Sequence, residues 1–181
     1  MKVFISGGCK NGKTSYGQDI AVRLASGGPL YYVATMIPYD DEDRERIRKH
    51  IENRAGMGFQ TIEIGRDICS CLETADTGGT FLFDSVTALL LNEMFPDTHN
   101  SGADPEAGKR CRKELLEFVA SVKNAVFISD YIYSDAARYD EFTENYRRTL
   151  AMLDRSLAAV CDTVIELCAA NTVIHKGELP K

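Results

Sequence analysis

The residues most suited to chemistry lie near the start of the chain, in a glycine-rich run that ends with lysine and threonine. Residues 7–14 match the pattern G-x-x-x-x-G-K-[ST]. Glycines let the backbone curl so that successive N–H groups point at one anion. Lys13 would neutralise the β- and γ-phosphates of a nucleotide, and the Thr14 hydroxyl would bind Mg²⁺. The residues predicted to bind nucleotide here are Gly7, Gly8, Cys9, Lys10, Asn11, Gly12, Lys13 and Thr14.

The flanking sequence is that of a phosphate-binding loop. The apolar stretch 3–5 predicts a strand before it, and apolar residues recur after it at the spacing of one buried helix face. A helix that starts at the loop adds the positive end of its dipole to the anion site. The alternative is a tight glycine turn followed by a chance Lys-Thr pair. The order strand, loop, helix favours nucleotide binding.

A carboxylate for the magnesium shell is predicted at the end of another apolar stretch. Asp84 follows residues 80–83, and phosphate-loop enzymes use an acidic residue near the loop to hold the metal. Thr14 and Asp84 are therefore the predicted metal-binding residues. Two alternatives stay open: Asp84 could instead cap the next helix, or Asp130, which follows the stretch 124–129, could serve the metal.

The segment 40–54 is dense in charges of both signs, which by itself indicates a solvated helix with pairs one turn apart. His50 has Arg46 one turn before it and Arg54 one turn after it, so a helix would present all three on one side. A neutral imidazole between two guanidinium groups can attack phosphorus while the cations position phosphate oxygens. This spacing makes catalysis by His50 a hypothesis that needs support from elsewhere.

The elements that must position these residues alternate along the chain. Strands are predicted at 30–34, 80–83, 124–129 and 163–167, and helices at 41–54, 87–95, 106–123 and 139–160. This alternation predicts an α/β fold with a mostly parallel central sheet and helices on both faces. The length of 181 residues suits a single domain, 1–181. The polar stretch 96–105 is predicted to be a mobile loop, and Gly78-Gly79 a turn.

Composition limits the partners. The net charge of −6 and the isoelectric point near 5.1 argue against nucleic acid. No apolar stretch approaches the length of about 20 residues that a membrane helix needs, and no basic leader precedes the first strand, so we expect a cytoplasmic protein. The six cysteines contain no C-x-x-C pair, which predicts neither a zinc site nor a disulfide framework. His99 and His175 are predicted to be surface or edge-strand residues.

Together these features resemble the bifunctional adenosylcobinamide kinase/adenosylcobinamide-phosphate guanylyltransferase family of cobalamin biosynthesis. The resemblance implies a RecA-like P-loop fold and a homotrimer. It also implies two reactions: ATP or GTP phosphorylates adenosylcobinamide, and GMP is then transferred from GTP to the resulting phosphate. The matching blocks are 5–14; 32–35 followed by 40–42; Arg46, Ile47, His50 and Arg54; 60–63; and Phe83-Asp84 with Thr87 and Asn92.

The resemblance also assigns site residues. The family transfers GMP through a guanylylated histidine, and His50 is the matching position. The histidine segment is expected to move when nucleotide binds. GTP and ATP are the implied substrates, with Mg²⁺ as cofactor. The residues expected around the guanine nucleotide are Ala34, Thr35, Met36, Ile51, Glu52, Asn53, Arg54, Glu63 and Asp84.

Two stretches of the second half depart from the family pattern. Residues 130–133 read Asp-Tyr-Ile-Tyr where the family shows Asn-Glu-Val-Gly, and residues 151–155 carry Asp154 and Arg155 where it shows Asn-Gln. Charges in place of amides should alter recognition of a large polar ligand. The changes could instead lie at positions that face solvent or a neighbouring subunit. Two alternative functions stay open: a P-loop kinase for another small hydroxyl substrate, and a nucleotide-binding relative without catalysis.

Overall fold

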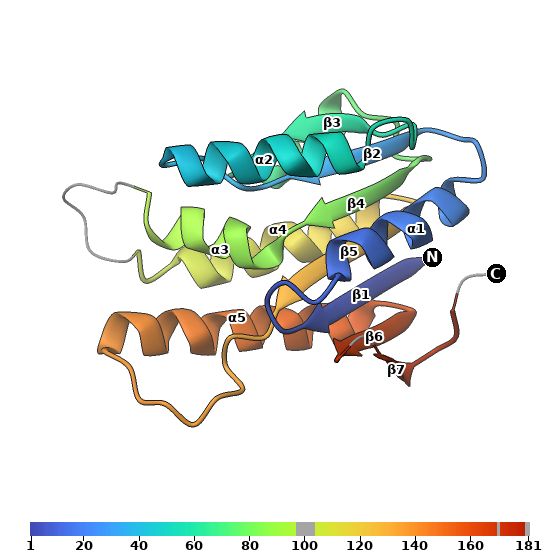
Figure 1. Ribbon diagram of the computed structural model, residues 1–181. Helices are drawn as coiled ribbons and strands as arrows, with labels where there is room; N and C mark the ends of the chain where they lie inside the picture. The colour runs from blue at the N-terminus through green and yellow to red at the C-terminus, as the bar shows by residue number, and fades with distance from the viewer. Residues whose placement is uncertain (97–103, 170, 180–181) are drawn as a thin grey trace.

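The computed structural model describes residues 1–96, 104–169 and 171–179. They form a seven-stranded sheet in the spatial order β3-β2-β4-β5-β1-β6-β7 (Figure 1). The strands are β1 (Lys2–Gly7), β2 (Leu30–Ala34), β3 (Gln60–Glu63), β4 (Thr80–Asp84), β5 (Asn124–Asp130), β6 (Thr163–Cys168) and β7 (Asn171–Lys176). The helices are α1 (Lys13–Ala25), α2 (Asp41–Asn53), the 3-10 helix η1 (Ile68–Glu73), α3 (Val86–Met94), α4 (Ala107–Ser121) and α5 (Glu141–Val160).

Parallel pairing dominates the sheet. Every neighbouring pair from β3 to β6 is parallel, and β7 pairs with β6 in the antiparallel sense. The central strands β4 and β5 are buried on both faces, which explains their continuous apolar runs. The predicted α/β fold with a mostly parallel sheet is confirmed.

Adjacent tyrosines on β2 show how the sheet supports two cores. Tyr31 packs on the face that α3, α4 and α5 cover, where its ring stacks on Phe81 at 4.7 Å between centroids. Tyr32 points to the opposite face and packs with Leu82 and with Ile20 of α1. Successive strand residues alternate between faces, so both faces need a helical layer. Figure 1 shows α1 in front of the sheet and α4 behind it, as the prediction of two covered faces requires.

Helix α2 is held differently from the others. Its amino terminus is capped by Asp40, whose carboxylate accepts a hydrogen bond of 2.8 Å from the backbone nitrogen of Asp43. None of its residues is buried, and Arg48 forms ion pairs with Glu45 and Glu52 along its surface. The prediction of a solvated, charge-paired helix is confirmed.

The predicted helices are all present, and their observed ends lie within two residues of the predicted ones. Strands β3 and β7 and helix η1 were not predicted. The edge strand β7 is exposed throughout and carries His175, as expected for that residue. The predicted loop 96–105 falls largely on 97–103, which, with His99, lies outside the described residues. Within the described part of the chain, no helix is long and apolar enough to cross a membrane, and all six cysteines have free thiols.

Candidate functional site

The carboxyl ends of four parallel strands bring the predicted site residues to one edge of the sheet. Gly7 at the end of β1 stands opposite Asp130 at the end of β5. Asp84 ends β4, beside β5, and pairs with Ala34 at the end of β2. Open α/β sheets bind ligands outside this edge. Residues far apart in the sequence thus converge around the glycine-rich loop.

The shape of the loop explains its glycines. Gly12 has a φ of 90°, in the left-handed region that glycine adopts without strain. A Cβ on Gly7 would overlap the side-chain nitrogen of Asn11. That nitrogen donates a hydrogen bond of 2.6 Å to the carbonyl oxygen of Leu167, which ties the loop to β6. The Asn11 side chain therefore anchors the loop to β6 before α1 begins at Lys13.

Lys13 is buried, and its ammonium has three polar partners. Its ammonium donates to the Gly8 carbonyl oxygen at 2.6 Å and to Asn11 Oδ1 at 3.2 Å, and it pairs with Asp130 Oδ1 at 2.6 Å. A buried ammonium requires such partners because it has lost its hydration. A nucleotide phosphate would compete with Asp130 for Lys13. Asp130 thus sits beside the lysine of the loop.

Asp84 lies beside Thr14, whose hydroxyl donates to Asp84 Oδ2 at 3.1 Å. The Tyr32 hydroxyl donates to the same oxygen at 2.5 Å. Burial, together with the charge of Asp84, raises the pKa of Tyr32, so its phenol stays protonated and donates. Helix α3 is capped by Ser85, whose hydroxyl accepts from the Ala88 nitrogen at 3.2 Å. The alternative in which Asp84 caps this helix is therefore wrong.

The side-chain oxygens of Thr14 and Asp84 are of the kind and number that a Mg²⁺ site commonly takes from a protein. Mg²⁺ binds hard oxygen ligands and commonly takes one or two carboxylates together with substrate phosphates. Thr14 and Asp84 supply a hydroxyl and a carboxylate in contact with each other. Within the described residues, no group of three His, Cys, Asp or Glu side chains could hold a metal by itself. Nucleotide phosphates and water are the ligands that would complete the shell of a Mg²⁺ ion held by Thr14 and Asp84.

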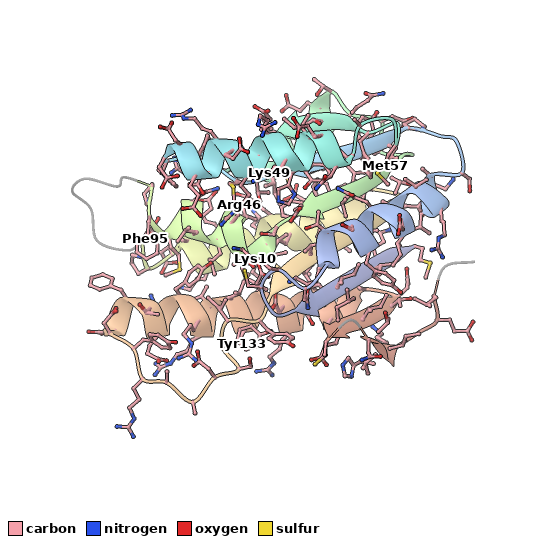
Figure 2. The ribbon with its side chains drawn as sticks, in the orientation of Figure 1. Lys10, Arg46, Lys49, Met57, Phe95 and Tyr133 are labelled. Atoms are coloured by element: carbon pink, nitrogen blue, oxygen red, sulfur yellow. The ribbon has the colours of Figure 1, made fainter. Side chains whose placement is uncertain are left out.

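A cavity of about 360 Å³ opens over the loop. Figure 2 shows Arg46 on the side of α2 that faces the loop bearing Lys10, and both residues line this cavity. The cavity combines loop backbone, cations and carboxylates, as a phosphate site requires. Its lining residues are Cys9, Lys10, Asn11, Gly12, Lys13, Thr14, Ser15, Met36, Arg46, His50, Asp84, Ser85, Ile128 and Asp130.

A second cavity, of about 270 Å³, lies between α2 and the ends of β2 and β3. Arg54 is buried in its wall, where the guanidinium carbon stands 4.1 Å from the centroid of the Tyr32 ring. Arg54 also donates to the Thr61 hydroxyl at 2.9 Å. The lining residues are Tyr32, Ala34, Met36, Pro38, Arg44, Ile47, His50, Arg54, Glu63, Asp84, Ser85 and Ala88.

His50 borders both cavities, together with Met36, Asp84 and Ser85. Its two arginine neighbours divide between them: Arg46 lines the loop cavity and Arg54 lines the second. The helix thus brings all three predicted residues to the site, with the histidine at the junction. A ligand that spans the two cavities would pass the imidazole.

Other predicted nucleotide residues lie off the two cavities as the described residues form them. Thr35 is fully buried, and its hydroxyl donates to the Ser85 carbonyl oxygen at 2.8 Å. Ile51, Glu52 and Asn53 line neither cavity, and Glu52 pairs with Arg48. Gly7 and Gly8 also line neither cavity. Contacts of these residues with nucleotide stay predictions.

Several lining residues were not predicted from the sequence. Tyr32 precedes Ala34 by two positions on β2 and so shares its face of the sheet, which is a signal the sequence carried. Ile47 precedes His50 by three residues and so lies on its side of α2. Arg44 lies three residues before Ile47 and lines the same cavity. The sequence carries no such signal for Pro38 and Ala88, because only the folded chain brings them to the second cavity.

The two departures from the family pattern meet in the structure. Asp154 on α5 is buried and accepts a hydrogen bond of 2.8 Å from the Tyr133 hydroxyl. Burial raises the pKa of Asp154 to about 7, although that hydrogen bond opposes the rise. The suggestion that both changes face solvent or a neighbouring subunit is therefore wrong for Asp154, whereas Arg155 is exposed.

Comparison with protein families gives one match over nearly the whole chain. Residues 3–173 match the family described as cobinamide kinase/cobinamide phosphate guanyltransferase. A comparison with curated protein sequences gives no match.

Similar solved structures agree on the fold. One solved ATPase domain superposes with a TM-score of 0.55 at 10% identity, over 97% of this chain and 76% of that one. The flagellar accessory protein FlaH from Methanocaldococcus jannaschii gives 0.52 at 14% identity, over 99% and 79%. The Pyrococcus horikoshii OT3 protein PH0250 gives 0.53 at 10% identity, over 97% and 86%. At these identities the likeness shows the fold alone, and it confirms the expected RecA-like P-loop architecture.

Proposed function

The chain belongs to the cobinamide kinase/cobinamide phosphate guanyltransferase family, and we propose that it carries out both reactions of that name. Membership supports a nucleotide-dependent transferase of cobalamin biosynthesis. In the proposed sequence, ATP or GTP phosphorylates the aminopropanol hydroxyl of adenosylcobinamide, and GMP from GTP is then joined to that phosphate. The observation that supports this proposal is the position of His50, which borders both the loop cavity and the second cavity.

In the phosphoryl transfer, the acceptor hydroxyl oxygen attacks the γ-phosphorus. The bond from that phosphorus to the β–γ bridging oxygen breaks, the nucleoside diphosphate leaves, and the hydroxyl proton passes to solvent. The loop N–H groups and Lys13 would hold the phosphates, and Thr14 and Asp84 would hold Mg²⁺, which neutralises the developing charge. Asp130 would release Lys13 to the phosphates as nucleotide enters, because the two acceptors compete for one ammonium.

In the guanylyl transfer, a neutral nitrogen of His50 attacks the α-phosphorus of GTP and pyrophosphate leaves, so that GMP is joined to the imidazole by a P–N bond. A phosphate oxygen of adenosylcobinamide phosphate then attacks the same phosphorus and the P–N bond breaks. This gives adenosylcobinamide-GDP. Splitting one displacement between two anions into two steps gives each step a positioned nucleophile. Arg46 and Arg54, on either side of His50, would hold the phosphate oxygens.

The second cavity is the proposed place of the guanine base. Its walls include Ala34, Ile47 and Ala88, which offer apolar surface to a flat ring, and Glu63 lines it with a carboxylate. A carboxylate accepts hydrogen bonds from the exocyclic amine of guanine, a donor that adenine does not carry at that position. This arrangement would favour GTP over ATP for the guanylyl step. By family resemblance we further propose that the chain acts as a homotrimer in the cytoplasm.

Intact-mass spectrometry of the protein after incubation with GTP and Mg²⁺ tests this function. We expect a mass gain of one GMP in the wild type and none in His50→Ala. The adduct should be labile in acid and should transfer to adenosylcobinamide phosphate. Absence of any adduct, under conditions where GTP binds, would contradict the guanylyltransferase proposal.

A P-loop kinase for another small hydroxyl substrate is the second candidate. It is favoured by the charged residues that replace family amides, since Asp130 pairs directly with Lys13 and Asp154 is buried next to Tyr133. Under this candidate, His50→Ala keeps phosphoryl transfer whereas Lys13→Ala abolishes it, and no GMP adduct forms on the wild type.

A further inference from the structure

Two hydroxyl groups meet one oxygen of the carboxylate that faces the phosphate loop. The Tyr32 hydroxyl donates to Asp84 Oδ2 at 2.5 Å, and the Thr14 hydroxyl donates to the same atom at 3.1 Å. Both hydrogen bonds end on Oδ2, so Oδ1 is the oxygen that remains available to a metal or to its water ligands. The rotation of the Asp84 carboxylate is therefore set by its neighbours.

The ring of Tyr32 is itself held on both sides. Only 3% of Tyr32 is exposed, and its ring packs in the core cluster of α1 and meets Phe59 edge-on at 5.8 Å between centroids. The Arg54 guanidinium covers the ring at 4.1 Å and is fixed by Thr61. Stacking of a guanidinium on an aromatic ring is favourable, more so where both are desolvated. The phenol oxygen thus has a defined position beside Asp84.

We propose that Tyr32 is a positioning residue for the Mg²⁺ site: it orients the Asp84 carboxylate so that Oδ1 serves the metal bound with nucleotide at the loop. Residues that hydrogen-bond a metal ligand fix its orientation, and their loss commonly weakens metal binding by about 10-fold or more. Tyr32 and Arg54 both line the second cavity, whereas Asp84, which Tyr32 contacts, borders both cavities. The inference rests on the proposed nucleotide site.

A merely structural tyrosine would give a different result, and the chain offers a matched control. Tyr31 is the preceding residue on β2, is also buried, and uses its hydroxyl to accept a hydrogen bond of 3.0 Å from the Asp76 nitrogen, on the opposite face of the sheet. Tyr31→Phe removes one buried hydroxyl from the same strand without touching Asp84. Any general loss of stability should appear in both variants, whereas a change in Mg²⁺ dependence should appear only in Tyr32→Phe.

The experiment measures binding of a fluorescent GTP analogue as Mg²⁺ is titrated, with a parallel series in EDTA. We expect Tyr32→Phe to need about 10-fold more Mg²⁺ for half-maximal enhancement of binding. Its affinity in EDTA should equal that of the wild type, and Tyr31→Phe should match the wild type in both series.

Two results would overturn the inference while leaving the proposed function intact: Tyr32→Phe with the Mg²⁺ dependence of the wild type, or an equal shift in both variants. Failure of the wild type to bind the analogue at any Mg²⁺ concentration would instead contradict the proposed function, and the inference with it. The readout is binding, so it does not depend on which acceptor the enzyme uses.

Discussion

Helices α1 and α2 have the same length of 13 residues and both bring reactive groups to the proposed nucleotide site, yet they are held in opposite ways. Helix α1 buries Lys13, Gly17, Gln18, Ile20 and Ala21 against the sheet. Helix α2, which carries His50, buries none of its residues. The comparison indicates that Lys13, the proposed phosphate-binding group, is built into the core, while the proposed nucleophile stands on a helix that the core does not fix.

The physical basis of this difference lies in which interactions stabilise each helix. Burial of Ile20 and Ala21 makes α1 part of the global fold. Helix α2 relies on the Asp40 cap and on exposed ion pairs such as Arg48 with Glu45, which salt screens and which contribute little. A segment with few buried contacts opens at low free-energy cost. This suits the proposed role of α2, in which the helix closes on GTP and releases the product.

The largest expected effect is on the rate of phosphoryl transfer, when a lysine of α1 and a lysine of α2 are each replaced by alanine. Lys13→Ala, in α1, should reduce phosphoryl transfer by about 10³-fold or more, because it removes the buried cation that stabilises the phosphates. Lys49→Ala, in α2, should change it little, since that side chain is 64% exposed and lines neither cavity in the described structure. Steady-state kinetics of both variants would measure the difference. Equal losses of phosphoryl-transfer rate in the two variants would contradict the proposed difference between the helices.

The next largest difference between the helices should be in the free energy of unfolding that a substitution removes. Ile20→Ala removes a side chain that is 1% exposed and should lower the free energy of unfolding by about 2–5 kcal/mol. Ile51→Ala, at a position 46% exposed, should lower it by less than about 0.5 kcal/mol. Urea titration followed by circular dichroism measures both values. Similar losses would show that α2 is packed more tightly than its exposure indicates.

A titratable group in the packed region should make stability depend on pH in a way that the exposed charges of α2 do not. The pKa of Asp154 is about 7 in the folded chain because of burial, against 3.8 when unfolded. Between these values the folded state holds the proton and the unfolded state has lost it, so stability falls as pH rises from 3.8 to about 7. At 1.36 kcal/mol per pKa unit, the total is of order 4 kcal/mol.

Thermal unfolding of wild type and Asp154→Asn across this range checks the sign. As pH rises, the stability of the variant should increase relative to that of the wild type. Above pH 7 the variant should be the more stable protein, because asparagine carries no charge to bury. A difference that does not vary with pH would contradict the assignment of Asp154 as a buried, titrating acid.

The smallest effect is expected within α2 itself. Glu45→Gln removes an exposed ion pair with Arg48 and should leave the unfolding midpoint and GTP binding unchanged within error. Thermal unfolding at low and high salt measures this directly. A clear loss at low salt that disappears at high salt would show that ion pairs hold α2 more strongly than we infer.

The sequence predicted what depends on local pattern. The phosphate loop was identifiable because its chemistry requires glycines, lysine and threonine at fixed spacing, and the buried strands because they are continuous apolar runs. Strand β7 gave no such signal, since all of its residues are exposed. Asp154 lies four residues after Leu150 and three before Leu157, both buried, so its burial could have been predicted from helical spacing. Tertiary packing alone places His50 between two cavities.

The central claim is that a fixed loop holds the phosphates while a loosely held helix supplies the histidine. Hydrogen–deuterium exchange of the free protein and of the protein with GTP and Mg²⁺ tests it most directly. We predict that backbone amides of α2 exchange much faster than those of α1 in the free protein, and that GTP slows exchange in α2 more than in α1. Equal protection of the two helices without nucleotide, or no change in α2 when GTP binds, would contradict the account.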